Sequence, residues 1–352
     1  MKARIRDFIH TTDDLFFATT NYAHPSNKIL AFLRYIPDEN GDREKDGKRY
    51  SKVDSQQAYE YIRENCTEYL YFSNVTKEEM IAVPHNKIES IIRPEERLKE
   101  IMDTYKPETA DQFTKNLISL AEIFYKEAGI PYENLGISGS TLPGLQKPGT
   151  SDLDFVIYGL ENHQKAMQTF SQIKDTNKIP DTKIESINNE FWGKLYTKRI
   201  KDDTLTPEEF QWYENRKNNR GIINGVLFDI LATKNWDEIN EKWGDITYEP
   251  VKNNITIEAT ITNTIGAYDN PATYKIKDAQ TLNGKKSPIT EIASLTHTYS
   301  GQVKNNEKII ARGRQERIIK KERIIGQRLL IGTTREALNE FIKIKNNTLP
   351  TE

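Results

Sequence analysis

One segment near the middle of the chain, GISGSTLPGLQKPGTSDLDFVIYG at residues 136–159, limits the fold most strongly. It contains a Gly-Ser pair, a loop rich in glycine and proline, and then two aspartates separated by a leucine. Residues two apart on a β-strand point to the same face, so Asp152 and Asp154 are expected on one face. Leu153 and Phe155 would point to the other. The segment therefore predicts a largely apolar strand that carries paired carboxylates.

Paired carboxylates on such a strand indicate a cation site. Two adjacent carboxylates repel each other and lose hydration when they are buried, so such a pair usually binds a cation or serves a function. Hard oxygen ligands suit Mg²⁺, with Mn²⁺ as an alternative ion. A third carboxylate, Asp229 in VLFDILAT, is expected on a neighbouring strand. Three such groups can hold two ions about 4 Å apart, which stabilise both oxygens of a phosphoryl displacement.

The Gly-Ser pair has the features of a phosphate-binding turn. Gly139 and Ser140 follow a predicted strand at residues 135–137 and precede an expected short helix, whose N-terminal N–H groups would be available to a triphosphate. Three nearby cations are candidates to neutralise phosphate charge: Lys147, Lys217 and Arg220. The alternative for each of them is an ordinary solvent-exposed charge on a loop.

The order of these elements resembles the nucleotidyltransferase superfamily that includes DNA polymerase β. The likeness consists of the Gly-Ser pair, the Asp-x-Asp strand and the later third carboxylate, and it covers roughly residues 107–235. The whole chain, including RDFIHTTDDLFFATTNYAHPSNKILAFLRYIPD and GQVKNNEKIIARGRQE, also looks like an archaeal family of predicted nucleotidyltransferases with extra domains at both ends.

This resemblance implies transfer of a nucleoside monophosphate from an NTP or dNTP to an acceptor hydroxyl, with release of pyrophosphate. Carried over to this sequence, Asp152 and Asp154 would bind both metal ions. Asp229 would bind the catalytic ion and help to activate the attacking hydroxyl. Gly139 and Ser140 would hold the triphosphate. We therefore expect a nucleotide-binding enzyme with two Mg²⁺ ions.

Composition narrows the class of protein. The chain has 352 residues, of which 36% are hydrophobic and 29% are charged, enough for a buried core and for two or three domains. No apolar run approaches the length of a membrane span, and the N-terminal residues do not resemble a signal peptide. A single cysteine, Cys66, excludes an internal disulfide. We therefore expect a cytoplasmic protein that binds any metal through oxygen.

The hydrophobic pattern divides this α+β chain into three segments, which we expect to be domains. Residues 1–104 are expected to form an α+β N-terminal domain, and the resemblance implies that residues 105–245 form a polymerase β-like core with a mixed sheet and helices. Residues 246–352 read as a β-rich domain, a candidate OB-like barrel, because ITIEATITNT and later runs alternate apolar and polar residues. A last helix is expected near residues 334–342.

The C-terminal domain also carries a basic block. Between Lys304 and Arg328, nine Lys or Arg residues stand against three Glu, while the net charge of the whole chain is −2. Such a block suits a polyanion, and its alternative is the solvated face of strands. The residues expected to contact nucleic acid are Arg312, Arg314, Arg317, Lys320 and Lys321.

The acceptor stays open on sequence grounds. The basic block favours RNA, such as a tRNA end, or DNA. A second hypothesis is transfer to a protein or a small molecule, as in toxin-like and antibiotic-modifying members of the superfamily. A third is a non-catalytic nucleic-acid-binding protein with a vestigial core. Nucleic-acid affinity that falls steeply with salt would separate the first hypothesis from the second.

Overall fold

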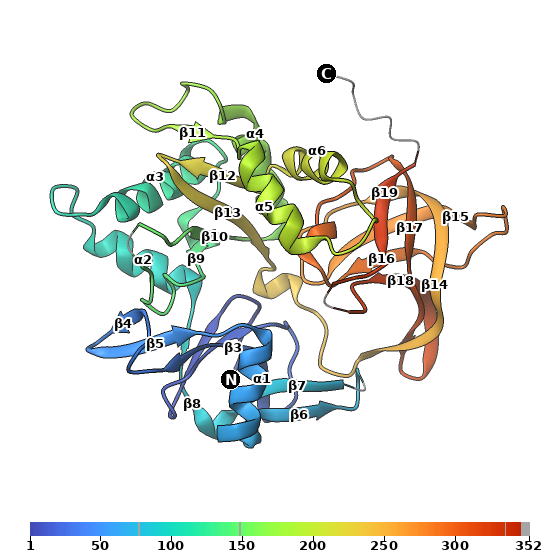
Figure 1. The fold of residues 1–352 in the computed structure, drawn as a ribbon, viewed down its shortest axis with the longest axis horizontal. Coiled ribbons are helices and arrows are strands. Elements are labelled where there is room, and N and C mark those ends of the chain that lie inside the picture. Colours follow the sequence, from blue (N-terminus) through green and yellow to red (C-terminus); the bar gives the residue numbers. More distant parts are fainter. Residues whose placement is uncertain (77, 148, 335, 346–352) are drawn as a thin grey trace. The chain divides into compact units, whose positions relative to one another are not determined.

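A computed structural model describes residues 1–76, 78–147, 149–334 and 336–345. In this part the chain is a mixed α+β protein with three β-sheets and six α-helices (Figure 1). It forms two compact units: Met1–Ile184 with Gly221–Trp243, and Glu185–Arg220 with Gly244–Glu352. The chain therefore passes between the units three times, and the expected division into three domains stays a prediction.

The first unit begins with an eight-stranded sheet. Its order is β4-β5-β3-β2-β1-β8, with β7 on β3 and β6 on β7. β3 pairs with β7 through residues 28–30 and with β5 through residues 35–37, so the sheet curls into a half-barrel. The strands are β1 (Phe8–Thr11), β2 (Phe16–Thr19), β3 (Lys28–Pro37), β4 (Arg43–Lys45), β5 (Lys48–Lys52), β6 (Leu70–Ser73), β7 (Glu78–Pro84) and β8 (Ile88–Ile92).

Helix α1 (Ser55–Asn65) covers the core of this sheet. A capping box starts it: the Asp54 carboxylate accepts the Gln57 N–H, and the Gln57 side chain accepts the Asp54 N–H. This exchange satisfies N–H groups that a helix end otherwise leaves unpaired. The buried side chains of Ala58 and Ile62 then pack against the sheet.

The second sheet of this unit has the order β11-β12-β13-β10-β9. β10 runs antiparallel to β9 and parallel to β13. Asn224 and Gly225, both with positive φ, form the turn from β12 to β13, as NG pairs in hairpins do. The strands are β9 (Leu135–Ile137), β10 (Leu153–Tyr158), β11 (Ile184–Glu185), β12 (Arg220–Ile223) and β13 (Val226–Thr233).

Three helices pack on this sheet: α2 (Pro94–Thr104), α3 (Gln112–Lys126) and α4 (Leu160–Ile173) (Figure 1). Leu117 and Phe124 of α3 are buried against Phe155 of β10 and Ile230 of β13. The alternating pattern of β10 thus leaves Leu153 and Phe155 in the core and turns Asp154 to the other face.

The second unit combines two helices with a β-rich sheet. β14 pairs with both β15 and β17, so the strands β14, β15, β16, β18 and β17 close into a ring in which β16 and β18 are parallel. β19 pairs with β17. The elements are α5 (Asn189–Arg199), α6 (Pro207–Lys217), β14 (Ile246–Asn263), β15 (Ala272–Thr281), β16 (Glu291–Ser294), β17 (Lys308–Lys320), β18 (Arg323–Ile331) and β19 (Phe341–Ile344).

Two expected helices are wrong. Near residues 334–342 the described chain turns and then forms β19, because Ala337 and Asn339 adopt positive φ. The Glu340 carboxylate also accepts the N–H groups of Gly332 and Thr333, which holds this segment in a turn. Residue 335 lies outside the described residues.

The short helix expected after the Gly-Ser pair is absent too. Residues 139–144 form consecutive turns. Gly139 and Gly144 have φ values of +60° and +75°, and Pro143 has no N–H to donate, so a regular helix cannot form there. The Leu145 N–H instead donates to the Ser140 carbonyl at 2.8 Å.

Among the described residues, no helix combines the length and apolar character needed to cross a membrane.

Candidate metal centre

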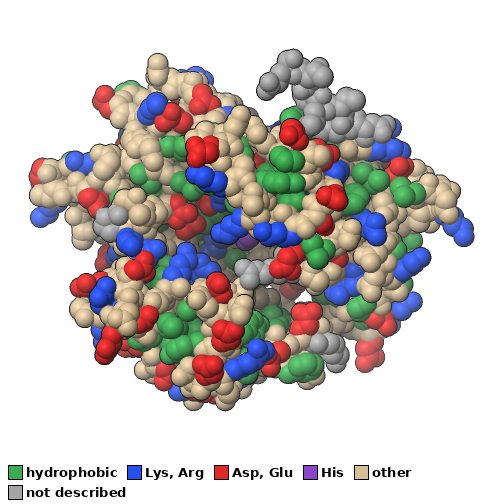
Figure 2. Space-filling view, in the orientation of Figure 1, with side chains coloured by type: hydrophobic (Ala, Val, Ile, Leu, Met, Phe, Trp, Pro, Cys, Tyr) green, Lys and Arg blue, Asp and Glu red, His purple; other side chains and the backbone are tan. Residues whose placement is uncertain are grey.

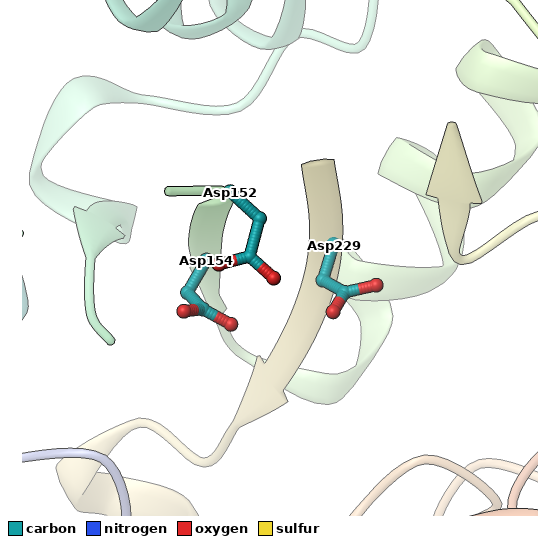
Figure 3. Close-up of side chains that lie close together, drawn as sticks. All are labelled: Asp152, Asp154 and Asp229. Carbon is teal, nitrogen blue, oxygen red and sulfur yellow. The ribbon is translucent and has the colours of Figure 1, made fainter. Parts of the chain in front are cut away.

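Three aspartates converge at the second sheet of the first unit. In the parallel pairing of β10 with β13, Asp154 lies directly opposite Asp229, and Asp152 comes immediately before β10. Figure 3 shows the three carboxylates close together, from these two neighbouring strands. Each can offer one oxygen so that all three oxygens lie within 4.8 Å of one another. Sequence spacing predicted this cluster, although Asp152 stands just outside the strand.

The environment of the cluster disfavours unneutralised negative charge. Asp229 is buried, and Asp152 and Asp154 are half-buried. Burial, followed by repulsion from Asp152 and Asp229, raises the pKa of Asp154 to about 7. A divalent cation would relieve both effects, because it supplies positive charge and oxygen coordination to all three groups. The donor set therefore fits Mg²⁺ or Mn²⁺, and the aspartates can bind a metal ion.

Gly139 makes room for this arrangement. Its backbone has φ +60°, and a Cβ added there would lie 1.8 Å from Oδ2 of Asp154. The Ser138 N–H donates to the Asp154 carbonyl at 2.8 Å, which ties the turn to β10. A side chain at residue 139 would therefore displace a candidate metal ligand. The sequence predicted a phosphate-binding role for this glycine and did not reveal its packing against Asp154.

The loop between the Gly-Ser pair and the aspartates is held by hydroxyl contacts. The Ser140 hydroxyl is buried and donates to the Ser151 hydroxyl at 3.2 Å. The Ser151 hydroxyl also accepts the Lys147 N–H at 2.8 Å. The Lys147 ammonium lies 3.2 Å from the Asp42 carboxylate, and both side chains are exposed. The structure thus places Ser140 and Lys147 in the loop that leads into Asp152.

The N-terminal sheet contributes charges to the same site, which the sequence did not predict. Arg6 and Lys52 favour the ionised form of Asp154 and oppose the rise of its pKa. The buried hydroxyl of Tyr35 lies in the field of Asp152 and Asp154, and burial raises its pKa. No local pattern marks these residues, because packing of the N-terminal sheet against the loop at Leu142 and Leu145 brings Tyr35 and Lys52 to the site from far along the chain.

Lys217 lies in the second unit, unlike the three aspartates, and Arg220 is the first residue of β12, where the chain passes from the second unit to the first. Lys217 is buried, and its ammonium donates to the Glu214 carboxylate at 2.7 Å and to the Thr298 carbonyl at 2.8 Å. The Arg220 guanidinium lies 5.6 Å from the centre of the Phe191 ring. The predicted phosphate ligand Lys217 therefore has a structural ion pair, and Arg220 has an aromatic neighbour.

The basic block lies on β17 and on its turn to β18. Arg314 donates to Glu316 at 2.8 Å, and Arg328 donates to the other oxygen of the same buried carboxylate at 2.8 Å. Arg317 pairs with Glu249 at 2.9 Å. Figure 2 shows Lys and Arg interspersed with Asp and Glu over this part of the molecule. Three of the nine basic residues of the block are therefore paired with a carboxylate.

The remaining basic residues of the block differ in exposure. Arg312 is half-buried on β17, and Lys320 is exposed at its end. Lys321 adopts positive φ in the turn. Among the described residues, Lys320 and Lys321 form no ion pair. The available cationic surface of this segment is thus smaller than the sequence suggests.

Comparison with known proteins identifies one similar chain. Uncharacterized protein MJ1086 of Methanocaldococcus jannaschii is 43% identical over 354 aligned residues, which cover 98% of this chain and 100% of that protein. No family model matches the chain. No solved structure matches it either. Identity at this level over both full lengths shows common descent, and the chain therefore belongs to the same protein family as the archaeal protein MJ1086.

Proposed function

We propose that this protein is a metal-dependent nucleotidyltransferase that moves a nucleoside monophosphate from an NTP or dNTP to an acceptor hydroxyl. The observation that carries the proposal is the aspartate cluster on two adjacent parallel strands, with Gly139 packed directly against Asp154. A cluster of this kind, beside a turn whose N–H groups can face a phosphate, suits phosphoryl transfer.

The aspartates would divide the work of holding the ions. Asp152 and Asp154 would ligate both divalent ions, and Asp229 would ligate the one beside the attacking hydroxyl and help to take up its proton. The ions supply charge neutralisation at the attacking and leaving oxygens. The acceptor oxygen forms a bond to the α-phosphorus while the bond from that phosphorus to the pyrophosphate oxygen breaks.

The Gly-Ser turn supports a phosphate-binding role. The N–H groups of Gly139 and Ser140 donate no hydrogen bond to any described residue. Unpaired N–H groups at a glycine turn form a concave surface that suits anions. These N–H groups would hold the triphosphate, while the Ser140 hydroxyl stays bound to Ser151 and keeps the turn in shape.

We propose further that the ring of β14 to β18 is an OB-like barrel. The closed order β14-β15-β16-β18-β17, with β16 parallel to β18, supports this assignment. Barrels of this class bind oligonucleotides on one strand face. The acceptor favoured by this reasoning is RNA or DNA.

The ion pairs of the basic block favour a second candidate, transfer to a protein or a small molecule. Glu316 pairs with both Arg314 and Arg328, and Glu249 pairs with Arg317. A surface with fewer available cations would bind a nucleic-acid backbone less strongly. The barrel would then contact a partner without tracking phosphates.

The proposal is tested by incubating the full chain with Mg²⁺ and each α-labelled NTP and dNTP. Reactions contain no acceptor, total RNA, tRNA or single-stranded DNA. The Asp152→Asn/Asp154→Asn variant serves as the inactive control, and Glu133→Gln, at an exposed carboxylate, is the matched charge control. Label transferred by wild type and Glu133→Gln alone supports the proposal, and its carrier names the acceptor class. No label on any acceptor would leave a vestigial core as the better account.

A further inference from the structure

We propose that the N-terminal sheet supplies the cationic half of the nucleotide site, with Arg34 of β3 and Lys52 of β5 binding the triphosphate of the nucleotide. This inference rests on the proposed nucleotidyltransferase function and adds a substrate-binding role for residues outside the aspartate core. It also assigns the N-terminal sheet a role in substrate binding.

The strand geometry singles out Arg34. β2 pairs Phe16 with Tyr35 and Phe17 with Leu33, so Arg34 is an extra residue in β3 without a partner in β2. Its carbonyl accepts the Val53 N–H at 3.0 Å from the chain just after β5. A β-bulge redirects a side chain and bends the strand, and bulges are frequent beside active sites.

Lys52 lies on the face that meets the Gly-Ser loop. It is paired directly with Tyr35 across β3 and β5, and paired residues share a face of the sheet. Tyr35 is buried in a cluster with Leu142 and Leu145, which belong to the loop after the Gly-Ser pair. The pairing therefore directs the Lys52 side chain towards the loop that leads to Asp152.

Contacts of Arg43 attach the N-terminal sheet to the loop. The Arg43 guanidinium on β4 donates to the Leu145 carbonyl at 3.0 Å and to the Ser151 hydroxyl at 3.3 Å. Ser151 immediately precedes Asp152. The β4-β5 hairpin is thus attached to the segment that positions the aspartates. We assign Arg43 a positioning role.

The charges of the two sides act on each other without forming ion pairs. Partial desolvation, and then the Arg34 charge, lower the pKa of Lys52, while Asp152 and Asp154 oppose that change. Among the described residues, neither Arg34 nor Lys52 has a carboxylate oxygen within 4 Å. Lys52 therefore lies near Arg34 and the two aspartates, but farther from each carboxylate than a salt bridge allows.

A small polyanion is the ligand that suits this arrangement of charges. Two divalent ions would more than neutralise three carboxylates, and Arg34 and Lys52 would add further positive charge. A triphosphate places several anionic oxygens within one compact group, where a planar guanidinium and an ammonium can bind them together. An extended nucleic-acid backbone would call for a longer cationic stripe than two neighbouring side chains provide.

The test measures binding of inorganic tripolyphosphate to the full chain by titration calorimetry in the presence of Mg²⁺. The variants are Arg34→Gln and Lys52→Gln, and the matched control is Arg49→Gln. Arg49 is exposed on β5, on the face of the strand opposite to that of Tyr50 and Lys52. Each site variant should weaken tripolyphosphate binding about tenfold or more, because it removes a charge-assisted hydrogen bond to an anionic oxygen. Arg49→Gln should bind like wild type, and all three variants should retain Mn²⁺ binding without tripolyphosphate, because the three aspartates are intact.

The outcomes separate this inference from the function on which it rests. If wild type binds tripolyphosphate and transfers label, but Arg34→Gln and Lys52→Gln bind as tightly as Arg49→Gln, the inference is wrong and the transferase stands. If the two variants lose binding to a single-stranded RNA and keep tripolyphosphate affinity, the cations serve the acceptor and the inference is again wrong. A wild type that neither binds tripolyphosphate nor transfers label would remove both claims.

Discussion

Asp154 shows how one residue links the fold to its chemistry. Its backbone belongs to a buried strand, while its carboxylate lies beside those of Asp152 and Asp229 and against Gly139. In the metal-free chain, this clustering of like charges destabilises the folded state. Such destabilisation is typical of functional sites, where neighbours and burial shift pKa values away from those of free side chains.

Replacing Asp154 with Asn is expected to stabilise the metal-free protein near pH 8. Removal of one charge relieves desolvation and repulsion, by on the order of 1–3 kcal/mol given about 1.4 kcal/mol per pKa unit and partial exposure. The same variant should lose Mn²⁺ binding. Chemical denaturation with and without Mn²⁺ measures both effects. A variant that is less stable than wild type and still binds Mn²⁺ would show that Asp154 has a structural role.

The pH dependence of stability has a defined sign. Without metal, the pKa of Asp154 rises from 3.8 to about 7 on folding, so the folded chain holds this proton more tightly than the unfolded chain. That contribution is fully present below about pH 4 and is lost as the pH rises through about 7. Metal binding requires the ionised form. Mn²⁺ should therefore raise the melting temperature more at about pH 8 than at about pH 5.5.

Asp7 provides the control for this pH effect. Burial raises its pKa to about 7 as well, and it is not one of the clustered aspartates. In Asp7→Asn the larger gain with Mn²⁺ at high pH should persist, whereas in Asp154→Asn it should disappear. An equal gain at both pH values in wild type would argue against a metal site at the three aspartates.

Gly139 offers a steric test of the same site. Alanine at this position would be strained at φ +60° and would bring its Cβ against the Asp154 carboxylate. Gly139→Ala should lower the free energy of unfolding by about 1–3 kcal/mol and abolish Mn²⁺ binding. Gly149→Ala is the matched control, since Gly149 has φ +78° and no described atom within 4 Å of an added Cβ. Gly149→Ala should show the destabilisation that comes from backbone strain but should retain Mn²⁺ binding.

Among the elements, helix α6 shows which features could be predicted from sequence and which could not. Lys217 was expected to contact phosphate, yet it is buried in the second unit with Glu214. Thr206 and Glu209 form the capping box that the sequence predicted at the other end of this helix. The start of α6 could therefore be predicted from the local sequence. The burial of Lys217 at its end could not, because it depends on a contact with the distant residue Thr298.

Lys217→Ala is expected to destabilise the second unit by about 3–5 kcal/mol, because it leaves the Glu214 carboxylate buried without its closest cation. Lys198→Ala, an exposed change on α5, should have little effect. Denaturant unfolding followed by tryptophan fluorescence gives the comparison, since Trp192 is buried in this unit. If Lys217→Ala is as stable as Lys198→Ala, the buried pair is not a structural support.

Elements with strong periodicity were predictable, and those governed by unusual backbone angles were not. β14 and α3 follow their alternating and helical patterns. The helix expected near residues 334–342 does not form. Ala337 and Asn339 adopt positive φ there, and the sequence did not predict these backbone angles. The aspartate cluster could be predicted because its spacing carries chemical information. Arg34 and Lys52 could not, because a bulge and a strand pairing place them.

At the scale of the whole molecule, the aspartate cluster and the curled N-terminal sheet belong to one compact unit. The relative from Methanocaldococcus jannaschii aligns over its full length, so the sequence of both units is shared within the family. The proposed site thus combines carboxylates from one sheet with cations from another.

The most direct test of this account is a Mn²⁺ titration followed by electron paramagnetic resonance, with a non-hydrolysable nucleoside triphosphate present. The account predicts two Mn²⁺ ions per chain that are magnetically coupled at roughly 4 Å. It also predicts that Asp152→Asn/Asp154→Asn loses both ions while Glu133→Gln retains them. Identical Mn²⁺ binding by wild type and the double variant, or no binding by wild type, would contradict the claim that the three aspartates form a metal centre for nucleotide transfer.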